Sequence, residues 1–156
     1  MKILLYIVTG LFVILSLYFV ALSISSRKQP ELGLLNGQLR ACPASPNCVC
    51  SEGQGGMEFV EPLSVTTTAD DAWRTAKKAI VETGGVIVTE RDDYLHAEFV
   101  TPLMRYVDDV ELRKDDNKKV IHLRSASRVG HSDLGANRAR VEKLRKTFLK
   151  ATGVGK

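Results

Sequence analysis

The stretch Val86–Val129, VIVTERDDYLHAEFVTPLMRYVDDVELRKDDNKKVIHLRSASRV, decides the fold. It contains four segments that are rich in β-branched and aromatic residues, a composition typical of strands, and charged residues fill two of the turns between them. Consecutive strands joined by short turns pair in an antiparallel sense. The sequence therefore predicts an antiparallel sheet made from Val86–Glu90, Tyr94–Thr101, Arg105–Arg113 and Val120–Val129.

Two amphipathic helices flank this stretch. Phe59–Thr67 predicts a first strand, and Thr68 with Asp71 three positions later predicts the start of a helix that ends at about Thr83. Ser132 or Asp133 can cap a final helix. The expected core positions of the two helices are Ala72, Trp73, Ala76, Ala79 and Ile80 in the first, and Leu134, Val141, Leu144, Phe148 and Ala151 in the second.

The resulting order of elements is β-α-β-β-β-β-α. It predicts an α+β fold in which an antiparallel sheet of about five strands carries two helices on one face. We expect this globular domain to occupy residues 57–156, after a linker and cysteine-containing loop at 27–56.

Residues 1–26 are expected to form a transmembrane anchor. The apolar run Ile3–Ile24 is long enough to cross a hydrocarbon core of about 30 Å. A cleaved signal peptide is the alternative, but its apolar region is normally only about 7–15 residues long, and Ala21-Leu22-Ser23 is a poor cleavage site. The charges flanking the run do not fix its orientation.

The net charge of +4 does not by itself indicate a nucleic-acid partner. From Gln29 onward the chain has 19 basic and 18 acidic residues, although 11 of the basic ones and only two of the acidic ones follow Asp116. The domain is thus almost neutral, with its basic residues toward the C-terminus. This pattern favours a local basic surface toward phosphate or anionic lipid over general binding of nucleic acid.

All three cysteines lie in the segment CPASPNCVC, residues 42–50. Two prolines and Asn47 favour a turn that could bring Cys42 and Cys48 together in a disulfide, which would indicate an oxidising compartment. A metal site is disfavoured because the segment has no CxxC pair. Three partly buried thiols remain the other alternative.

The segment from Arg124 to Arg138 has the densest set of polar functional groups. If Val110 pairs with Leu123, Asp109 lies opposite Arg124 and Glu111 opposite His122. This face would be either a ladder of exposed ion pairs or an anion-binding site. The residues that could bind the anion are Asp109, Arg124, Ser127, Arg128, Asn137 and Arg138.

Two catalytic alternatives are weaker. His131 and Asp133 lie near several serines, as a small hydrolase would require, but no GxSxG motif accompanies them. The other alternative is thiol redox chemistry by Cys42 and Cys48. The sequence indicates no cofactor, no metal and no particular protein partner.

Three motifs together resemble an uncharacterised family, domain of unknown function 1499. They are CPxSPNCV from Cys42, VDDVE from Val107, and RSxSRxGxxDxGxNRxR from Arg124. The resemblance implies a small domain, often behind a signal or anchor segment, without an established reaction or cofactor. Cys50 stands where the family pattern has serine, which further disfavours a metal site.

From these observations we expect a membrane-anchored envelope domain on the periplasmic or extracytoplasmic side. It would act as a binding or accessory module for an anionic or lipid-like partner.

Overall fold

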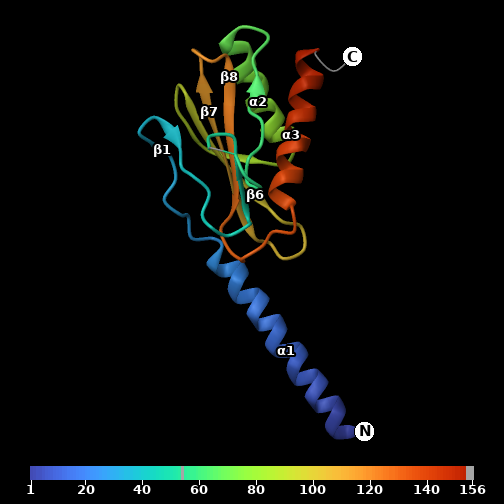
Figure 1. Ribbon diagram of the computed structural model, residues 1–156. Helices are drawn as coiled ribbons and strands as arrows, with labels where there is room; N and C mark the ends of the chain where they lie inside the picture. Colours follow the sequence, from blue (N-terminus) through green and yellow to red (C-terminus); the bar gives the residue numbers. More distant parts are fainter. Residues whose placement is uncertain (54, 154–156) are drawn as a thin grey trace.

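The computed structural model describes residues 1–53 and 55–153. Its centre is a six-stranded antiparallel sheet with the order β3-β8-β7-β6-β5, and β4 pairs with another part of β8 (Figure 1). The predicted α+β class and order of elements are confirmed, and the cysteine segment adds one strand. The strands are β3 (Cys48–Cys50), β4 (Leu63–Ser64), β5 (Val86–Glu90), β6 (Tyr94–Val100), β7 (Val107–Asp115) and β8 (Val120–Ser127).

Helices α2 (Ala69–Glu82) and α3 (Ala136–Thr152) cover one face of this sheet (Figure 1). Thr68 caps α2, because its side chain accepts a hydrogen bond from the backbone N–H of Asp71 as predicted. The apolar stripe of α2 is buried as expected, and so are Val141, Leu144 and Phe148 of α3.

Two expected core residues are not buried. Leu134 is 96% exposed because α3 begins only at Ala136, so Leu134 lies in the preceding turn with a positive φ of 53°. Ala151 is also exposed, since it lies in the last turn of the helix, after Phe148. The final helix therefore contacts the core over a shorter length than its sequence pattern predicts.

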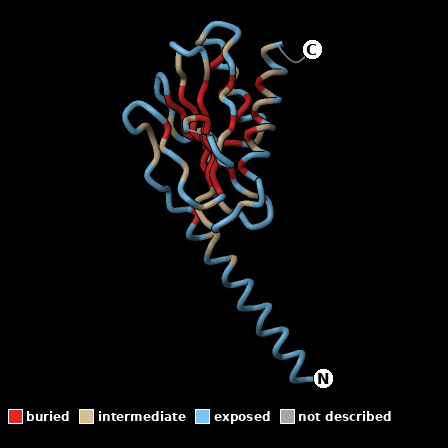
Figure 2. Tube along the Cα trace, in the orientation of Figure 1, coloured by how far each residue is buried: buried red, intermediate tan, exposed pale blue. Residues whose placement is uncertain are grey.

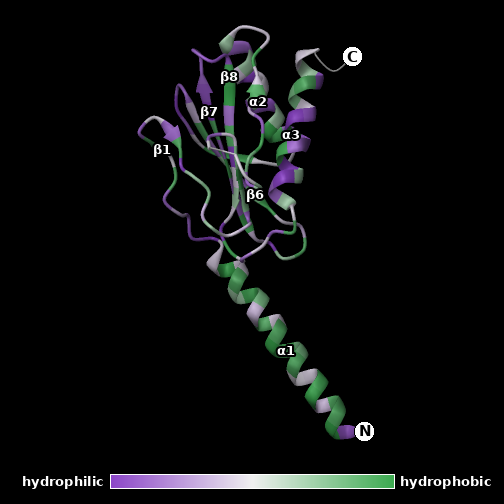
Figure 3. Ribbon diagram, in the orientation of Figure 1, coloured by the Kyte–Doolittle hydropathy of each residue, from purple (hydrophilic) through white to green (hydrophobic). Residues whose placement is uncertain are grey.

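Helix α1 (Lys2–Ser25) extends away from the domain (Figure 1). After Lys2 it is predominantly apolar (Figure 3), and its length and hydropathy are sufficient to cross a membrane. Its side chains are exposed except for the partly buried Phe19, Leu22 and Ser23 near its end.

A cover segment, residues 26–40, follows α1 directly and lies on the sheet face opposite the helices. It contains the two-stranded pair β1 (Leu34–Leu35) and β2 (Gln38–Leu39). Ser26 is fully buried, and its hydroxyl accepts a hydrogen bond from the backbone N–H of Val107 at 3.1 Å. This part of the expected linker is thus packed onto the sheet, and both faces of the sheet are buried (Figure 2).

The pairing of β7 with β8 differs from the expected register by two residues. Val110 pairs with Ser125 instead of Leu123, so Glu111 lies opposite Arg124. The turn at 116–119 sets this register, and Lys119 has a positive φ of 52° there. A shift of two residues keeps each side chain on its predicted face but changes its partner.

Candidate functional site

A buried polar network joins the cysteine segment to the start of α3. The Asn137 side-chain amide donates to the backbone oxygen of Asn47 and to Ser127 Oγ, both at 2.9 Å. In return, Asn47 Nδ2 donates to the backbone oxygen of Gly130 at 2.7 Å. Because Asn137 is fully buried, these bonds fix the two motifs relative to each other.

Arg140 extends this network on the helix-covered face of the sheet. It donates to Asp108 Oδ2 and to Asn137 Oδ1, each at 2.5 Å, and its guanidinium lies over the Phe99 ring at 5.2 Å from the centroid. Arg140 therefore contributes to the interior of the domain, although it belongs to the basic final helix.

Asp133 organises the turn before α3. Its carboxylate accepts hydrogen bonds from the backbone N–H groups of Gly135 at 3.0 Å and Asn137 at 2.7 Å. Although burial opposes it, these N–H groups lower the pKa of Asp133. The N-cap of α3 is Gly135, so neither Ser132 nor Asp133 is the N-cap residue that the sequence predicted. Asp133 instead satisfies backbone N–H groups at the helix start from two positions earlier, and Ser132 accepts only from Leu134 N–H within the turn.

A cavity of about 560 Å³ lies where the cysteine loop faces this turn. The loop contributes Pro43, Pro46 and the disulfide, and the turn contributes Ser132, Asp133 and Gly135. Met57, Glu58 and Arg138 complete the wall. Met57 and Glu58 were not predicted, because no local sequence pattern indicates that they approach the final helix.

Arg138 and Arg145, two turns apart on α3, hold the same chain segment. Arg138 Nη2 donates to the backbone oxygens of Met57 and Phe59, and Arg145 donates to those of Glu61 and Pro62. Only Arg138 lines the cavity. Its Nε and Nη1 have no hydrogen-bond partner among the described residues, so this guanidinium retains donors that a ligand could use.

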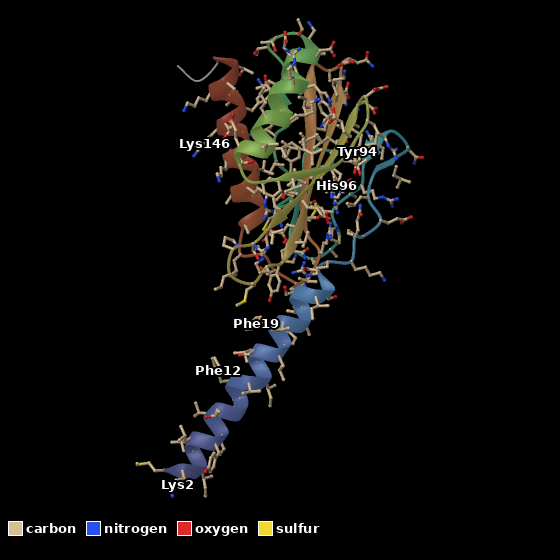
Figure 4. All side chains as sticks on the ribbon, turned by 180° about the vertical axis from the view of Figure 1, so that it is seen from behind. Lys2, Phe12, Phe19, Tyr94, His96 and Lys146 are labelled. Atoms are coloured by element: carbon tan, nitrogen blue, oxygen red, sulfur yellow. A yellow bond between two sulfur atoms is a disulfide. The ribbon has the colours of Figure 1, made fainter. Side chains whose placement is uncertain are left out.

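The predicted anion-binding residues do not converge on one site. Arg124, Arg128 and Asp109 lie beneath the cover segment on the other sheet face. Tyr94 and His96 lie on the same face (Figure 4). Ser127 and Asn137 belong to the buried network described above, and only Arg138 reaches the cavity.

Ion pairs occupy the charged groups on this covered face. Arg124 donates to Glu111 at 2.9 Å, and Arg128 donates to Asp109 at 2.7 Å and to Glu98 at 2.5 Å. Glu111 is fully buried and also accepts hydrogen bonds from the Tyr94 hydroxyl and the Gly33 backbone N–H. The ladder expected on an exposed face is therefore an internal network that holds the cover segment.

His96, Glu98 and Asp109 offer three ligand atoms within 4.8 Å of one another, a spacing compatible with a metal ion. Arg128 already donates to both carboxylates, so its guanidinium supplies the positive charge at this position. Burial alone would raise the pKa of Asp109, but the hydrogen bonds from Arg128 and His96 lower it. Both carboxylates of the group are thus paired, while the buried His96 Nδ1 has no hydrogen-bond partner among the described residues.

Cys42 and Cys48 form the expected disulfide, with their Cα atoms 5.6 Å apart. Cys50 is a buried free thiol, and its burial raises its pKa. Since the thiolate is the reactive form, Cys50 is poorly suited to exchange with the neighbouring disulfide at neutral pH.

The structure does not assemble a Ser-His-Asp triad around His131, which is exposed and forms no hydrogen bond with another described residue. A serine-histidine pair that the sequence did not reveal lies elsewhere, where Ser51 Oγ is 3.1 Å from His122 Nδ1. Both side chains are buried, and Ser51 does not line the cavity beside the cysteine loop. Burial lowers the pKa of His122, so we interpret this pair as structural.

A family profile matches the part of the chain that contains this site. The profile of the family described as "Protein of unknown function (DUF1499)" matches residues 38–148, which include both walls of the cavity and the entire central sheet. No curated protein matches the chain. Since the match covers most of the sequence, the chain belongs to the DUF1499 family.

Proposed function

We propose that this protein is a membrane-anchored envelope module that binds an anionic, lipid-like ligand in the cavity between the cysteine loop and the start of α3. The observation that carries the proposal is the cavity itself, whose walls come from the cysteine segment, from residues 57 and 58 and from the turn before α3, all within the residues that the family profile matches. At about 560 Å³ its volume falls within the range of small-molecule sites.

The chemistry of the walls supports a ligand with an apolar part and an anionic group. Pro43, Pro46, Val49 and Met57 offer apolar surface. Arg138 offers free guanidinium donors, the carboxylate of Asp133 is engaged by backbone N–H groups, and the second carboxylate of the wall, that of Glu58, is exposed to solvent. Of the residues predicted to bind an anion, Arg138 would contact the ligand, and Ser127 and Asn137 would position the walls.

Arg124, Arg128 and Asp109 would act at a greater distance. They hold the cover segment, and Arg128 Nη1 donates to the backbone oxygen of Ser26 at 3.1 Å, next to the end of α1. Their substitution would thus affect ligand binding through the fold. This assigns them a positioning role within the proposed module.

The location of the cavity supports a ligand drawn from the membrane. The end of β8 and the start of α3 lie at the end of the domain from which α1 leaves (Figure 1). The Cys42–Cys48 disulfide supports an oxidising, extracytoplasmic location, because disulfides are rare in reducing compartments.

The test is native mass spectrometry of the detergent-extracted full-length protein. We expect a bound species that is retained in Arg145→Gln but lost in Arg138→Gln. Arg145 is the matched control because it makes the same type of contact to backbone oxygens from the same helix, outside the cavity.

Equal retention in both variants, or no bound species in the wild-type protein, would contradict the proposal. Turnover of the bound species that His131→Ala abolishes would instead support the hydrolase alternative. A loss of function caused only by replacing both disulfide cysteines with serine, with the ligand retained, would support a redox role.

A further inference from the structure

The loop between β6 and β7 presents apolar side chains outward. Leu103 is 85% exposed and Met104 is 36% exposed. The base of the loop is closed by two hydrogen bonds between Thr101 and Tyr106, at 2.8 and 2.9 Å. The loop is therefore an ordered hairpin end that holds large apolar groups away from the core.

This loop contacts α1 within its apolar length. Ser23 Oγ donates to the backbone oxygen of Arg105 at 3.4 Å, and the partly buried residues of α1 begin at Phe19 (Figure 4). Since a helix rises 1.5 Å per residue, Phe19 lies about 9 Å inside the C-terminal end of α1. If α1 spans a bilayer, the loop lies at the depth of the head groups and the first acyl carbons.

A groove of about 370 Å³ separates the loop from the helix. Its apolar lining comes from both sides, and its charged lining residues are Arg27 and Arg105, with no carboxylate among them. Basic side chains beside an apolar surface suit the boundary between phosphate groups and acyl chains. The complete lining is Phe19, Val20, Ser23, Ile24, Arg27, Leu103, Met104 and Arg105.

We infer that this groove binds one phospholipid of the leaflet that faces the domain. The acyl chain lies against the apolar walls, Arg27 and Arg105 contact the phosphate, and Leu103 enters the bilayer. The inference rests on the membrane-anchoring part of the proposed function. It also adds a second lipid-binding surface, separate from the cavity that Arg138 lines, and seats the domain directly on the membrane.

Lipid retention tests the phosphate contact. The full-length protein is reconstituted in nanodiscs of phosphatidylglycerol and phosphatidylcholine, and bound phospholipid is counted by native mass spectrometry after release. We expect Arg27→Gln and Arg105→Gln each to weaken retention about tenfold, as for the loss of a charge-assisted hydrogen bond. Lys28→Gln is the matched control, since Lys28 adjoins Arg27 but does not line the groove. Equal retention in all three variants would overturn the site.

Insertion of the loop is tested with an environment-sensitive fluorophore on Leu103→Cys in vesicles of the same composition. We expect a blue-shifted emission that lipids spin-labelled near the head group quench. The control is Leu35→Cys, because Leu35 is 55% exposed on the cover segment. The native cysteines are buried or disulfide-bonded, so the introduced thiol is the one labelled. Identical, unquenched spectra at both positions would refute insertion.

These results separate the inference from the proposed function. An intact mass that lacks residues 1–26 would remove the anchor and the groove together. Retention of α1 with lipid loss only in Arg138→Gln would leave the cavity proposal standing and exclude the groove. Lipid loss only in Arg27→Gln and Arg105→Gln would support the groove and contradict the cavity proposal.

Discussion

The two faces of the central sheet are both buried, but by different chemistry. Leu112 and Leu123 face each other across β7 and β8 beneath the helices, and the adjacent pair Glu111 and Arg124 faces the cover segment. The first pair is stabilised by the apolar area it removes from water. The second is stabilised only while both charges remain paired. Adjacent residues of one strand therefore belong to two differently stabilised faces. We call the face stabilised by buried apolar area the area-driven face, and the face stabilised by paired charges the pair-driven face.

The largest effect is expected from breaking the charged pair. Glu111→Ala leaves Arg124 and the Tyr94 hydroxyl without their partner, and we expect it to lower the free energy of unfolding by about 3–5 kcal/mol. The measurement is urea unfolding followed by the fluorescence of Trp73, the single tryptophan. Adding Arg124→Met should recover part of the loss, and a further loss would contradict a pair-driven face.

The apolar pair should respond in the opposite way to a second substitution. Leu112→Ala is expected to cost about 2–5 kcal/mol, because it leaves a cavity beneath the helices. Adding Leu123→Ala enlarges that cavity, so the same unfolding measurement should show a further loss. Recovery in this double variant would remove the distinction between the two faces.

The disulfide gives a further test of the covered face, because it links the residues that follow the cover segment to β3. Replacing Cys42 and Cys48 with serine opens a loop of sequence separation 6, and we expect a loss of about 2 kcal/mol. Reduction of the wild-type protein should produce the same shift in the urea midpoint. If reduction has no effect, the packing of the cover segment is sufficient without the bond.

A smaller effect is expected at the start of α3. Asp133→Ala removes the acceptor for two backbone N–H groups and should cost about 0.5–2 kcal/mol. The neighbouring His131→Ala should change stability by less than about 0.5 kcal/mol, since His131 is exposed. Thermal unfolding of the two variants compares them directly. Equal losses of stability would show that the two hydrogen bonds accepted by Asp133 do not stabilise the start of α3.

The pair-driven face should also respond to pH. Burial lowers the pKa of His122 despite the nearby carboxylates of Glu52 and Asp115. Below about pH 6.5 the unfolded chain therefore binds a proton that the folded protein takes up only at lower pH, so stability falls as pH decreases.

His122→Gln should flatten this part of the stability profile between pH 7.5 and 5.5. A second decline should begin below about pH 4, as the unfolded chain takes up protons that Asp109 in the folded protein does not, and should continue until its lowered pKa is passed. An unchanged profile in the variant would assign the first decline to another group.

Much of the fold was predictable from local pattern. The four strand runs between Val86 and Val129, the cap at Thr68, the stripe of α2 and the pairing of Cys42 with Cys48 depend on residues close in sequence, and these predictions are confirmed. The predicted first strand, Phe59–Thr67, is a strand only at Leu63–Ser64. The register of β7 with β8 was not predictable, because the turn conformation at 116–119 determines it. The burial of Arg124 and Arg128 was missed for a different reason, since it depends on a cover segment far away in the sequence.

The sequence by itself determined the α+β class, the family, the apolar N-terminal helix and the side of the sheet on which each strand residue lies. These follow from periodicity and from motifs, which are local properties of the chain. Only the tertiary structure decided what covers each face, which charges are paired internally, and that residues from the segments 42–49, 57–58 and 132–138 line one cavity. Contacts between distant segments decide these features, and a strand pattern specifies which side chains share a face without specifying their partner.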